Sequence, residues 1–208
     1  MVEAYSRLTK GNGKIIIVGR NRTAADNIIA KLPQSSSQTP PLKFVQCDAT
    51  LMRNVHATSS EILANHPKIN FLVMSLEFMT TKGRDETEEG IDRKLAVHYY
   101  ARWAFTNDLM PALQKASEDG EEANVFSVLG AGKGADIDVK DLGLKKTYSV
   151  GNAGLAAPTS IWPTLHTAEP FILQNLRRKR CTWFDDCREN TSQPPPSHTK
   201  DRLEEALF

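Results

Sequence analysis

Long apolar runs, paired cysteines and an excess of charge are all missing from this sequence. No apolar run approaches the ~20 residues that a membrane-spanning helix needs, and the first five residues lack the charged start and apolar core of a signal peptide. Three cysteines, an odd number, fit a reducing compartment better than a disulfide framework. The net charge of +1 gives no electrostatic reason to expect a nucleic-acid or membrane partner. We therefore expect a soluble, cytoplasmic protein.

Four short apolar segments alternate with helical patterns along residues 1–159, which we expect to form one partial domain. The first segment, residues 14–18, has consecutive β-branched side chains without polar alternation, as is typical of a strand covered on both faces. Similar segments follow at residues 42–47, 70–74 and 124–129. Strands that alternate with helices pair in parallel through right-handed crossovers. The pattern therefore predicts an α/β fold with a doubly wound parallel sheet, Rossmann-like.

Helix signals lie between these strands. Residues 1–10 form one helical pattern. Thr23, with Asp26 three residues later, predicts the start of a second helix. Asp85 and Glu88 predict the start of a long helix, whose apolar positions recur at steps of three and four. These positions are Ile91, Leu95, Tyr99, Trp103, Thr106, Met110 and Leu113.

Three polar residues, Arg20, Asn21 and Arg22, follow the first strand. In open α/β sheets ligands bind outside the carboxyl ends of the strands, so these side chains are expected at a ligand crevice. In a dinucleotide-binding fold an acidic residue at this place binds the ribose 2′-hydroxyl, whereas an Arg accommodates a 2′-phosphate. The two arginines therefore favour NADP. The alternative is a charged, solvated loop without a ligand.

Residues 1–157 resemble the short-chain dehydrogenase/reductase family, most closely its divergent fungal members, some of which serve secondary-metabolite pathways. Val-Gly-Arg-Asn-Arg at residues 18–22 is similar to the family's second strand with its phosphate-selecting Arg. Cys-Asp-Ala-Thr at residues 47–50 resembles the segment that contacts adenine after the third strand. Thr-Tyr-Ser-Val at residues 147–150 resembles the start of the helix with the catalytic Tyr.

The resemblance implies hydride transfer between NADP(H) and a small carbonyl or alcohol substrate. Tyr148 would donate the proton and Ser127 would polarise the substrate oxygen, although a strict register places Gly130 at the family's Ser position. The helix between Ile91 and Leu113 resembles the family's interface helix, which implies a homodimer. The implied cofactor-binding residues are Arg20, Asn21, Arg22, Asp48, Ala49 and Ser75.

Four departures from the family pattern argue against a complete active enzyme. The pyrophosphate-binding loop Thr-Gly-x-x-x-Gly-x-Gly is expected just before Met1 and is absent, so we expect an incomplete sheet and weak cofactor binding. Glu77 lies where the family has an Asn-Asn-Ala-Gly turn, and His98 where it has a catalytic Asn. Asn152, four residues after Tyr148, replaces the Lys whose ammonium supports proton transfer. The alternative function is an inactive family remnant that acts as a binding or dimerisation module.

The remaining signals are weak. Residues 160–208 carry prolines and charge without a buried strand, and are expected to form a poorly ordered or partly helical tail that leaves the substrate unidentified. Cys181, Cys187 and His198 fit no closed zinc spacing, so no metal site is predicted. Residues 130–134 have the composition of a phosphate loop, but no helix follows them, which favours a flexible active-site loop.

Overall fold

The computed structural model describes most of the first 156 residues. The described residues are 1–32, 42–128, 136, 138 and 140–156. The glycine-rich segment 130–134, the expected tail 160–208 and the residues weighed as zinc ligands lie outside them.

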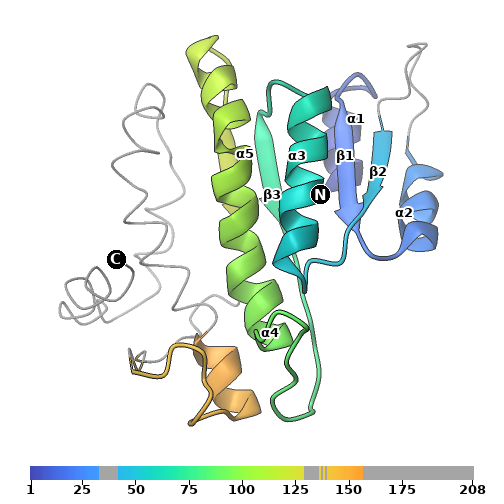
Figure 1. Cartoon of the computed structure of the whole chain (residues 1–208). Helices are drawn as coiled ribbons and strands as arrows, with labels where there is room; N and C mark the ends of the chain where they lie inside the picture. The colour runs from blue at the N-terminus through green and yellow to red at the C-terminus, as the bar shows by residue number, and fades with distance from the viewer. Residues whose placement is uncertain (33–41, 129–135, 137, 139, 157–208) are drawn as a thin grey trace, which may run out of the picture.

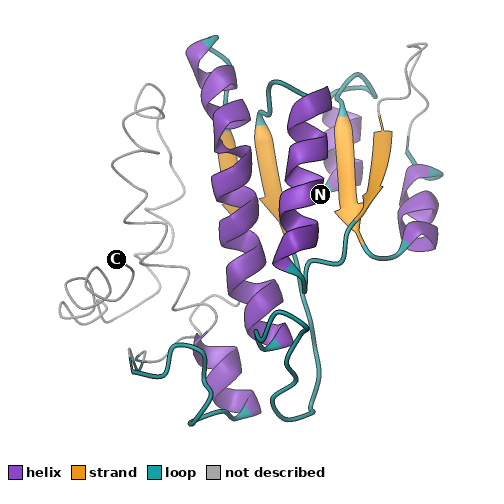
Figure 2. Ribbon diagram, viewed as in Figure 1, coloured by secondary structure: helices purple, strands orange, loops and turns teal. Residues whose placement is uncertain are grey.

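Four strands form at the predicted places, with bounds that differ by at most two residues. They are β1 (Ile15–Gly19), β2 (Leu42–Gln46), β3 (Phe71–Met74) and β4 (Asn124–Ser127). β1 pairs in parallel with β2, and β3 pairs in parallel with β4. Helices alternate with these strands along the chain, so the predicted Rossmann-like α/β fold is confirmed (Figures 1 and 2).

The sheet is divided into two parts in the described residues. No backbone ladder joins β1 to β3, although β1, β2 and β3 all run toward the same end of the molecule (Figure 1). Ile16 and Val18 of β1 pack against the same core cluster as Leu72 and Met74 of β3. The predicted incomplete sheet is therefore present as two strand pairs over one core. β1 is half-buried along its length, and not fully covered as its apolar run predicted.

Helices cover both faces of this divided sheet. On one face α3 (Met52–Asn65) lies against α5 (Ala101–Glu118), and their buried side chains include Val55, Ile62, Phe105 and Leu109. Behind β1 lies α1 (Val2–Leu8), and the Tyr5 ring meets the edge of the Phe71 ring on β3, with 6.1 Å between the ring centroids (Figure 1). Apolar packing from α3 and α5 therefore holds both strand pairs in place.

The cap of the helix after β1 lies two residues before the expected one. It is α2 (Arg22–Ile29), and its N-cap is Asn21, whose Oδ1 accepts a hydrogen bond from the Ala24 N–H at 3.0 Å. Asn21 has an extended backbone, as an N-cap residue requires, whereas Thr23 already lies inside the helix. The predicted Thr23 cap is wrong for this reason.

The long helix also begins at a different residue from the one predicted. Asp92 is the N-cap of α4 (Arg93–Leu95), and it accepts hydrogen bonds from the backbone N–H groups of Lys94 and Leu95. The expected capping residues Asp85 and Glu88 lie in the preceding loop, where the Asp85 N–H donates to the other oxygen of Asp92 at 3.1 Å. Asp92 therefore organises both the loop and the helix start.

A π-helical turn, η1 (Ala96–Tyr100), separates α4 from α5. Such a turn adds a residue to the helix and rotates the side chains that follow it. Leu95 before the turn is buried, but Trp103 after it is 38% exposed. The core-facing positions of α5 include Ala101, Ala104, Phe105, Leu109 and Ala112. The apolar stripe of the long helix therefore differs from the regular repeat in the sequence.

The capping role of Asp92 gives a direct test of this fold. We expect Asp92→Ala to destabilise the protein by about 1–2 kcal/mol, because it leaves three backbone N–H groups without their acceptor. Asp85→Ala, the matched control, removes only a partly exposed ion pair with Arg93 and should cost less than about 0.5 kcal/mol. Urea unfolding of the two variants measures the difference. Equal losses would contradict the assignment of the cap.

Candidate cofactor site and active site

The carboxyl ends of the strands bring the predicted cofactor residues to one edge of the fold. Gly19 lies opposite Gln46 in the parallel register, and the next N–H, that of Cys47, donates to the Gly19 carbonyl at 2.9 Å. Arg20 and Asp48 therefore follow adjacent strand ends. Ser75 follows β3 at the same end of the fold and is exposed (Figure 1).

The two arginines after β1 have different surroundings. The Arg22 guanidinium pairs with Asp26, with 3.0 Å between Nε and Oδ1, and lies 5.4 Å from the centroid of the Phe44 ring. Arg20 is exposed, and its guanidinium lies 5.8 Å from the centroid of the Phe78 ring. Among the described residues Arg20 forms no ion pair. Arg20 is therefore the arginine whose charge is available to an anionic ligand.

Asn21, Asp48 and Ala49 complete the predicted cofactor set. The Asn21 side-chain oxygen is already used as the cap of α2. Asp48 is half-buried, and its Oδ1 accepts from the Thr50 N–H at 3.0 Å. Its second oxygen receives no hydrogen bond within the described part of the chain, so it can accept from a ligand amine. Ala49 is 8% exposed and offers mainly its backbone.

The hydroxyl of Thr50, next to Ala49, is buried and has no hydrogen-bond partner among the described residues. Arg20, which forms no ion pair in the described residues, and the available oxygen of Asp48 could hold the adenosine end of a dinucleotide cofactor. The 208 residues contain no Thr-Gly-x-x-x-Gly-x-Gly motif for the pyrophosphate. The fit is therefore limited to one end of the cofactor.

Tyr148 lies just before a helical segment, residues 150–156, and has a lysine partner that the sequence did not indicate. Lys94 Nζ donates a hydrogen bond to the Tyr148 hydroxyl at 3.0 Å and lies 5.4 Å from the ring centroid. Lys94 is 7% exposed, and its ammonium also donates to the Lys82 carbonyl at 3.3 Å. Asn152, at the position of the family Lys, instead donates to the Thr147 carbonyl at 2.8 Å.

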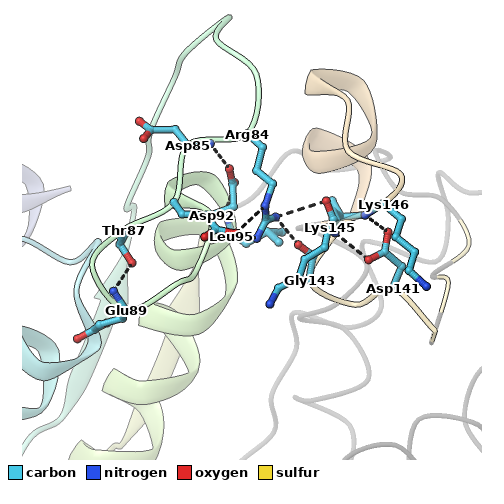
Figure 3. A network of polar contacts seen from close by, with 12 residues as sticks. Arg84, Asp85, Thr87, Glu89, Asp92, Leu95, Asp141, Gly143, Lys145 and Lys146 are labelled. Carbon is cyan, nitrogen blue, oxygen red and sulfur yellow. Dashed lines mark hydrogen bonds and ion pairs between the residues drawn. The ribbon is translucent and has the colours of Figure 1, made fainter.

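Asp141 shapes the loop that leads to Tyr148. Its carboxylate accepts hydrogen bonds from the backbone N–H groups of Lys145, Lys146 and Thr147, at 2.7, 2.9 and 2.8 Å (Figure 3). Burial by itself would raise the pKa of Asp141, but these donors and the Thr147 hydroxyl outweigh it and lower the pKa to about 2. The carboxylate is therefore charged at neutral pH and holds the loop closed.

Arg84 ties this loop to the segment before the long helix. Its Nη1 donates to the Gly143 carbonyl at 2.5 Å (Figure 3). Its Nε and Nη2 donate to Glu86. Asp92, the cap of α4, lies in the same network. The position of Tyr148 is thus fixed relative to the start of the long helix.

Ser127, the second predicted catalytic residue, lies at the end of β4 and is bound by a buried arginine. Arg102 of α5 is 3% exposed, and its Nη1 donates to Ser127 Oγ at 2.7 Å. Arg102 also donates to the carbonyls of Met74 and Leu76, and burial lowers its pKa. Because Arg102 follows Lys94 by eight residues, the two side chains start about 12 Å apart along the helix. The structure does not bring Ser127 and Tyr148 into contact.

His98, which replaces the family's Asn, lies between these two residues on the helix. Its Nε2 is 3.3 Å from both the backbone nitrogen and the carbonyl oxygen of Phe78. Burial lowers the pKa of His98, and the hydrogen bond with Phe78 only partly offsets this effect. The ring is therefore neutral near pH 7. Lys94, His98 and Arg102 together fasten the segment after β3 to one side of the long helix.

Two features are absent from the described residues. No group of three or more His, Cys, Asp or Glu side chains in these residues is placed to hold a metal ion. None of the helices in the described part is both long and apolar enough to cross a membrane.

Sequence comparison finds relatives among fungal oxidoreductases. The oxidoreductase AN1596 of Emericella nidulans is 36% identical over 137 residues, which are 66% of this chain and 40% of that protein. The oxidoreductase andH of Emericella variicolor is 32% identical over 168 residues, covering 80% of this chain and 45% of that protein. The chain thus spans less than half the length of these relatives. No protein-family model matches it.

Comparison of folds finds enzymes of one class. A metagenomic short-chain oxidoreductase in complex with NADP aligns with a TM-score of 0.58 and 15% identity, over 82% of this chain and 69% of that one. The 3-ketoacyl-(acyl-carrier-protein) reductase of Brucella melitensis, complexed with NADH, aligns with a TM-score of 0.53 and 18% identity, over 84% and 65%. At these identities the likeness concerns the fold.

The fold and the relatives together define the class of this protein. It has the Rossmann-like fold of dinucleotide-binding enzymes, and its curated relatives are oxidoreductases. The chain is related to fungal oxidoreductases, and its fold is similar to that of short-chain oxidoreductases.

The low pKa of Asp141 predicts how the stability of its loop depends on pH. The folded pKa of about 2 lies below the ordinary value of 3.8, so this carboxylate stabilises the fold fully above about pH 4 and loses its effect as the pH falls to about 2. We expect Asp141→Asn to be less stable than the original chain at pH 7 and to approach it in this acidic window. Thermal unfolding across pH measures this, with exposed Asp138→Asn as control. A difference independent of pH would contradict the assigned role.

Proposed function

We propose that this protein is an NADP(H)-dependent oxidoreductase that acts on a small carbonyl or alcohol substrate. The observation that carries the proposal is the exposed guanidinium of Arg20, which forms no ion pair within the described residues and which, like Asp48, follows the carboxyl end of one of two adjacent strands. An Arg at this place suits a 2′-phosphate, which NADP has and NAD lacks. The fungal relatives, named as oxidoreductases, support the reaction class.

The residues of this chain have separate roles in the proposed reaction. Arg20 binds the 2′-phosphate, Asp48 and the Ala49 backbone contact the adenine, and Ser75, which follows β3, contacts the cofactor. The bound cofactor supplies the hydride. The Tyr148 hydroxyl gives its proton to the substrate oxygen. Ser127 has no role in this proposed step, because Arg102 holds its hydroxyl at the other end of the helix face.

Cofactor binding by the 208 residues alone is expected to be weak. Each charge-assisted contact to a pyrophosphate contributes about 1.5–3 kcal/mol. Two or three missing contacts weaken binding by about 2–6 powers of ten, since every 1.4 kcal/mol is tenfold. We further propose a cytoplasmic location and a role in secondary metabolism, which the resemblance to divergent fungal reductases supports.

Comparison of the two arginines tests the cofactor proposal. We expect Arg20→Ala to weaken NADPH binding by about 10–100-fold and NADH binding little, because only NADPH carries the 2′-phosphate. Arg22→Ala is the matched control and should have a smaller effect, because Arg22 is already paired with Asp26. Fluorescence titration of both nucleotides measures the affinities. Equal loss for NADPH and NADH in Arg20→Ala would overturn the assignment.

A second candidate function is a dimerisation module built on the long helix. After the π-helical turn, Trp103 is 38% exposed, and Tyr99 and Met110 on the same helix are half-buried. A large aromatic side chain of this exposure is typical of an interface residue. This observation favours a homodimer through the predicted helix, whether or not the chain is active.

The dimer proposal gives a test that requires no cofactor. We expect the protein to sediment as a dimer and Trp103→Asp to sediment as a monomer, because a buried unpaired carboxylate opposes association. Leu142→Asp is a control, since Leu142 is similarly exposed, at 36%, but lies outside the helix. A monomeric original chain, or a Trp103→Asp variant that remains dimeric, would exclude this interface.

A further inference from the structure

Lys94 is a buried ammonium whose hydrogen-bond acceptors are all neutral groups. It is 7% exposed and donates to the Tyr148 hydroxyl and the Lys82 carbonyl. Among the described residues it forms no ion pair with a carboxylate. A buried ammonium is costly unless an opposite charge compensates it. Of these two acceptors, the phenol of Tyr148 is the one that can lose a proton and so carry a compensating negative charge.

The pair is held from both sides by one network of polar contacts (Figure 3). Asp92 accepts the Lys94 N–H at 3.0 Å and so fixes the backbone from which the lysine extends. Asp141 closes the loop before Tyr148, and Arg84 joins that loop to the segment preceding α4 (Figure 3). This contact is a built feature of the fold, because three backbone segments must be in place to form it: the start of α4, the loop before Tyr148 and the segment that carries Arg84.

We propose that Lys94 supplies the positive charge that Asn152 cannot, so that Lys94 and Tyr148 form a proton-donating pair assembled from two distant parts of the chain. The catalytic part of this inference rests on the proposed function. Bound NADPH would supply a hydride to the carbonyl carbon, while the carbonyl oxygen would take the proton of Tyr148. The products are the alcohol, NADP and the Tyr148 phenolate. Lys94 keeps its proton and stabilises the phenolate until solvent protonates it again.

Asn152 has a different task in this arrangement. Its side-chain amide donates to the Thr147 carbonyl, and its backbone N–H donates to Ser149 Oγ at 2.9 Å. Both contacts stabilise the start of the helical residues 150–156. An amide carries no charge, so Asn152 supports the position of Tyr148 and does not stabilise a phenolate.

Nitration of the full chain by tetranitromethane tests the pair without cofactor or substrate, because the reagent attacks the phenolate form of tyrosine. Peptide mass spectrometry reports the rate at Tyr148. We expect Lys94→Met to lower this rate by about tenfold, as when an opposite charge at hydrogen-bonding distance is removed. Lys94→Arg, which keeps the charge, should retain most of the rate. Adding Asn152→Lys to Lys94→Met should restore part of it.

Lys145→Met is the matched control, because only the backbone N–H of Lys145 takes part in the Asp141 network. It should leave nitration of Tyr148 unchanged. Thermal unfolding of each variant identifies any loss of fold. If Lys94→Met nitrates at the rate of Lys145→Met, or faster, the proposed pair is wrong.

Turnover separates this inference from the proposed function. With NADPH and a panel of small ketones and aldehydes, Lys94→Met should lose about 100-fold in kcat with little change in KM. Unchanged kcat in an active Lys94→Met variant overturns the catalytic part. If the original chain reduces none of these substrates while nitration still depends on Lys94, the oxidoreductase proposal fails and the pair stands.

Discussion

Three basic side chains spaced four residues apart connect the long helix to the segment that leaves β3. Lys94 donates to the Lys82 carbonyl, His98 contacts Phe78, and Arg102 donates to the carbonyls of Leu76 and Met74. Because each contact lies one turn further along the helix, the segment runs along it in the opposite direction. The contacts place Tyr148 at one end of this helix face and Ser127 at the other. The geometry of the candidate active site therefore depends on these contacts.

The hydrophobic core holds the two strand pairs together, because no backbone ladder joins them in the described residues. Without a ladder between β1 and β3, the two strand pairs keep their relative position through Val55, Ile62, Phe105 and Leu109 of the covering helices. Burial of each such side chain contributes about 1.5–3 kcal/mol. The inner edges of β1 and β3 have backbone groups without strand partners, which makes this the weakest part of the described fold. Arg20 and Asp48 belong to one pair, and Ser75 and Ser127 belong to the other.

The strands were predictable because their signal is local, whereas the helix starts and the lysine partner were not. A run of β-branched residues such as residues 15–18 has few alternatives to a buried strand. Several Asp, Asn and Thr residues precede each helix, and only the backbone conformation selects Asn21 and Asp92 among them. Lys94 lies 54 residues from Tyr148, so no spacing rule indicates their contact. Arg20 and Asp48 were predictable because strand ends determine their place.

The separation of Ser127 from Tyr148 changes how the resemblance to active reductases applies to this chain. A shared catalytic site requires both hydroxyls on one substrate oxygen. Here Lys94 binds the Tyr148 hydroxyl and Arg102 binds the Ser127 hydroxyl, and these two cations lie two helical turns apart. Arg102 has no carboxylate partner among the described residues, and its Nε has no acceptor there, so it uses carbonyls and Ser127 to satisfy its remaining donors. Releasing Ser127 would leave a further buried donor unpaired, which costs about 1–3 kcal/mol. Ser127 therefore belongs to the structure that joins β3, β4 and α5, and the proposed proton transfer belongs to the end of the helix at Lys94.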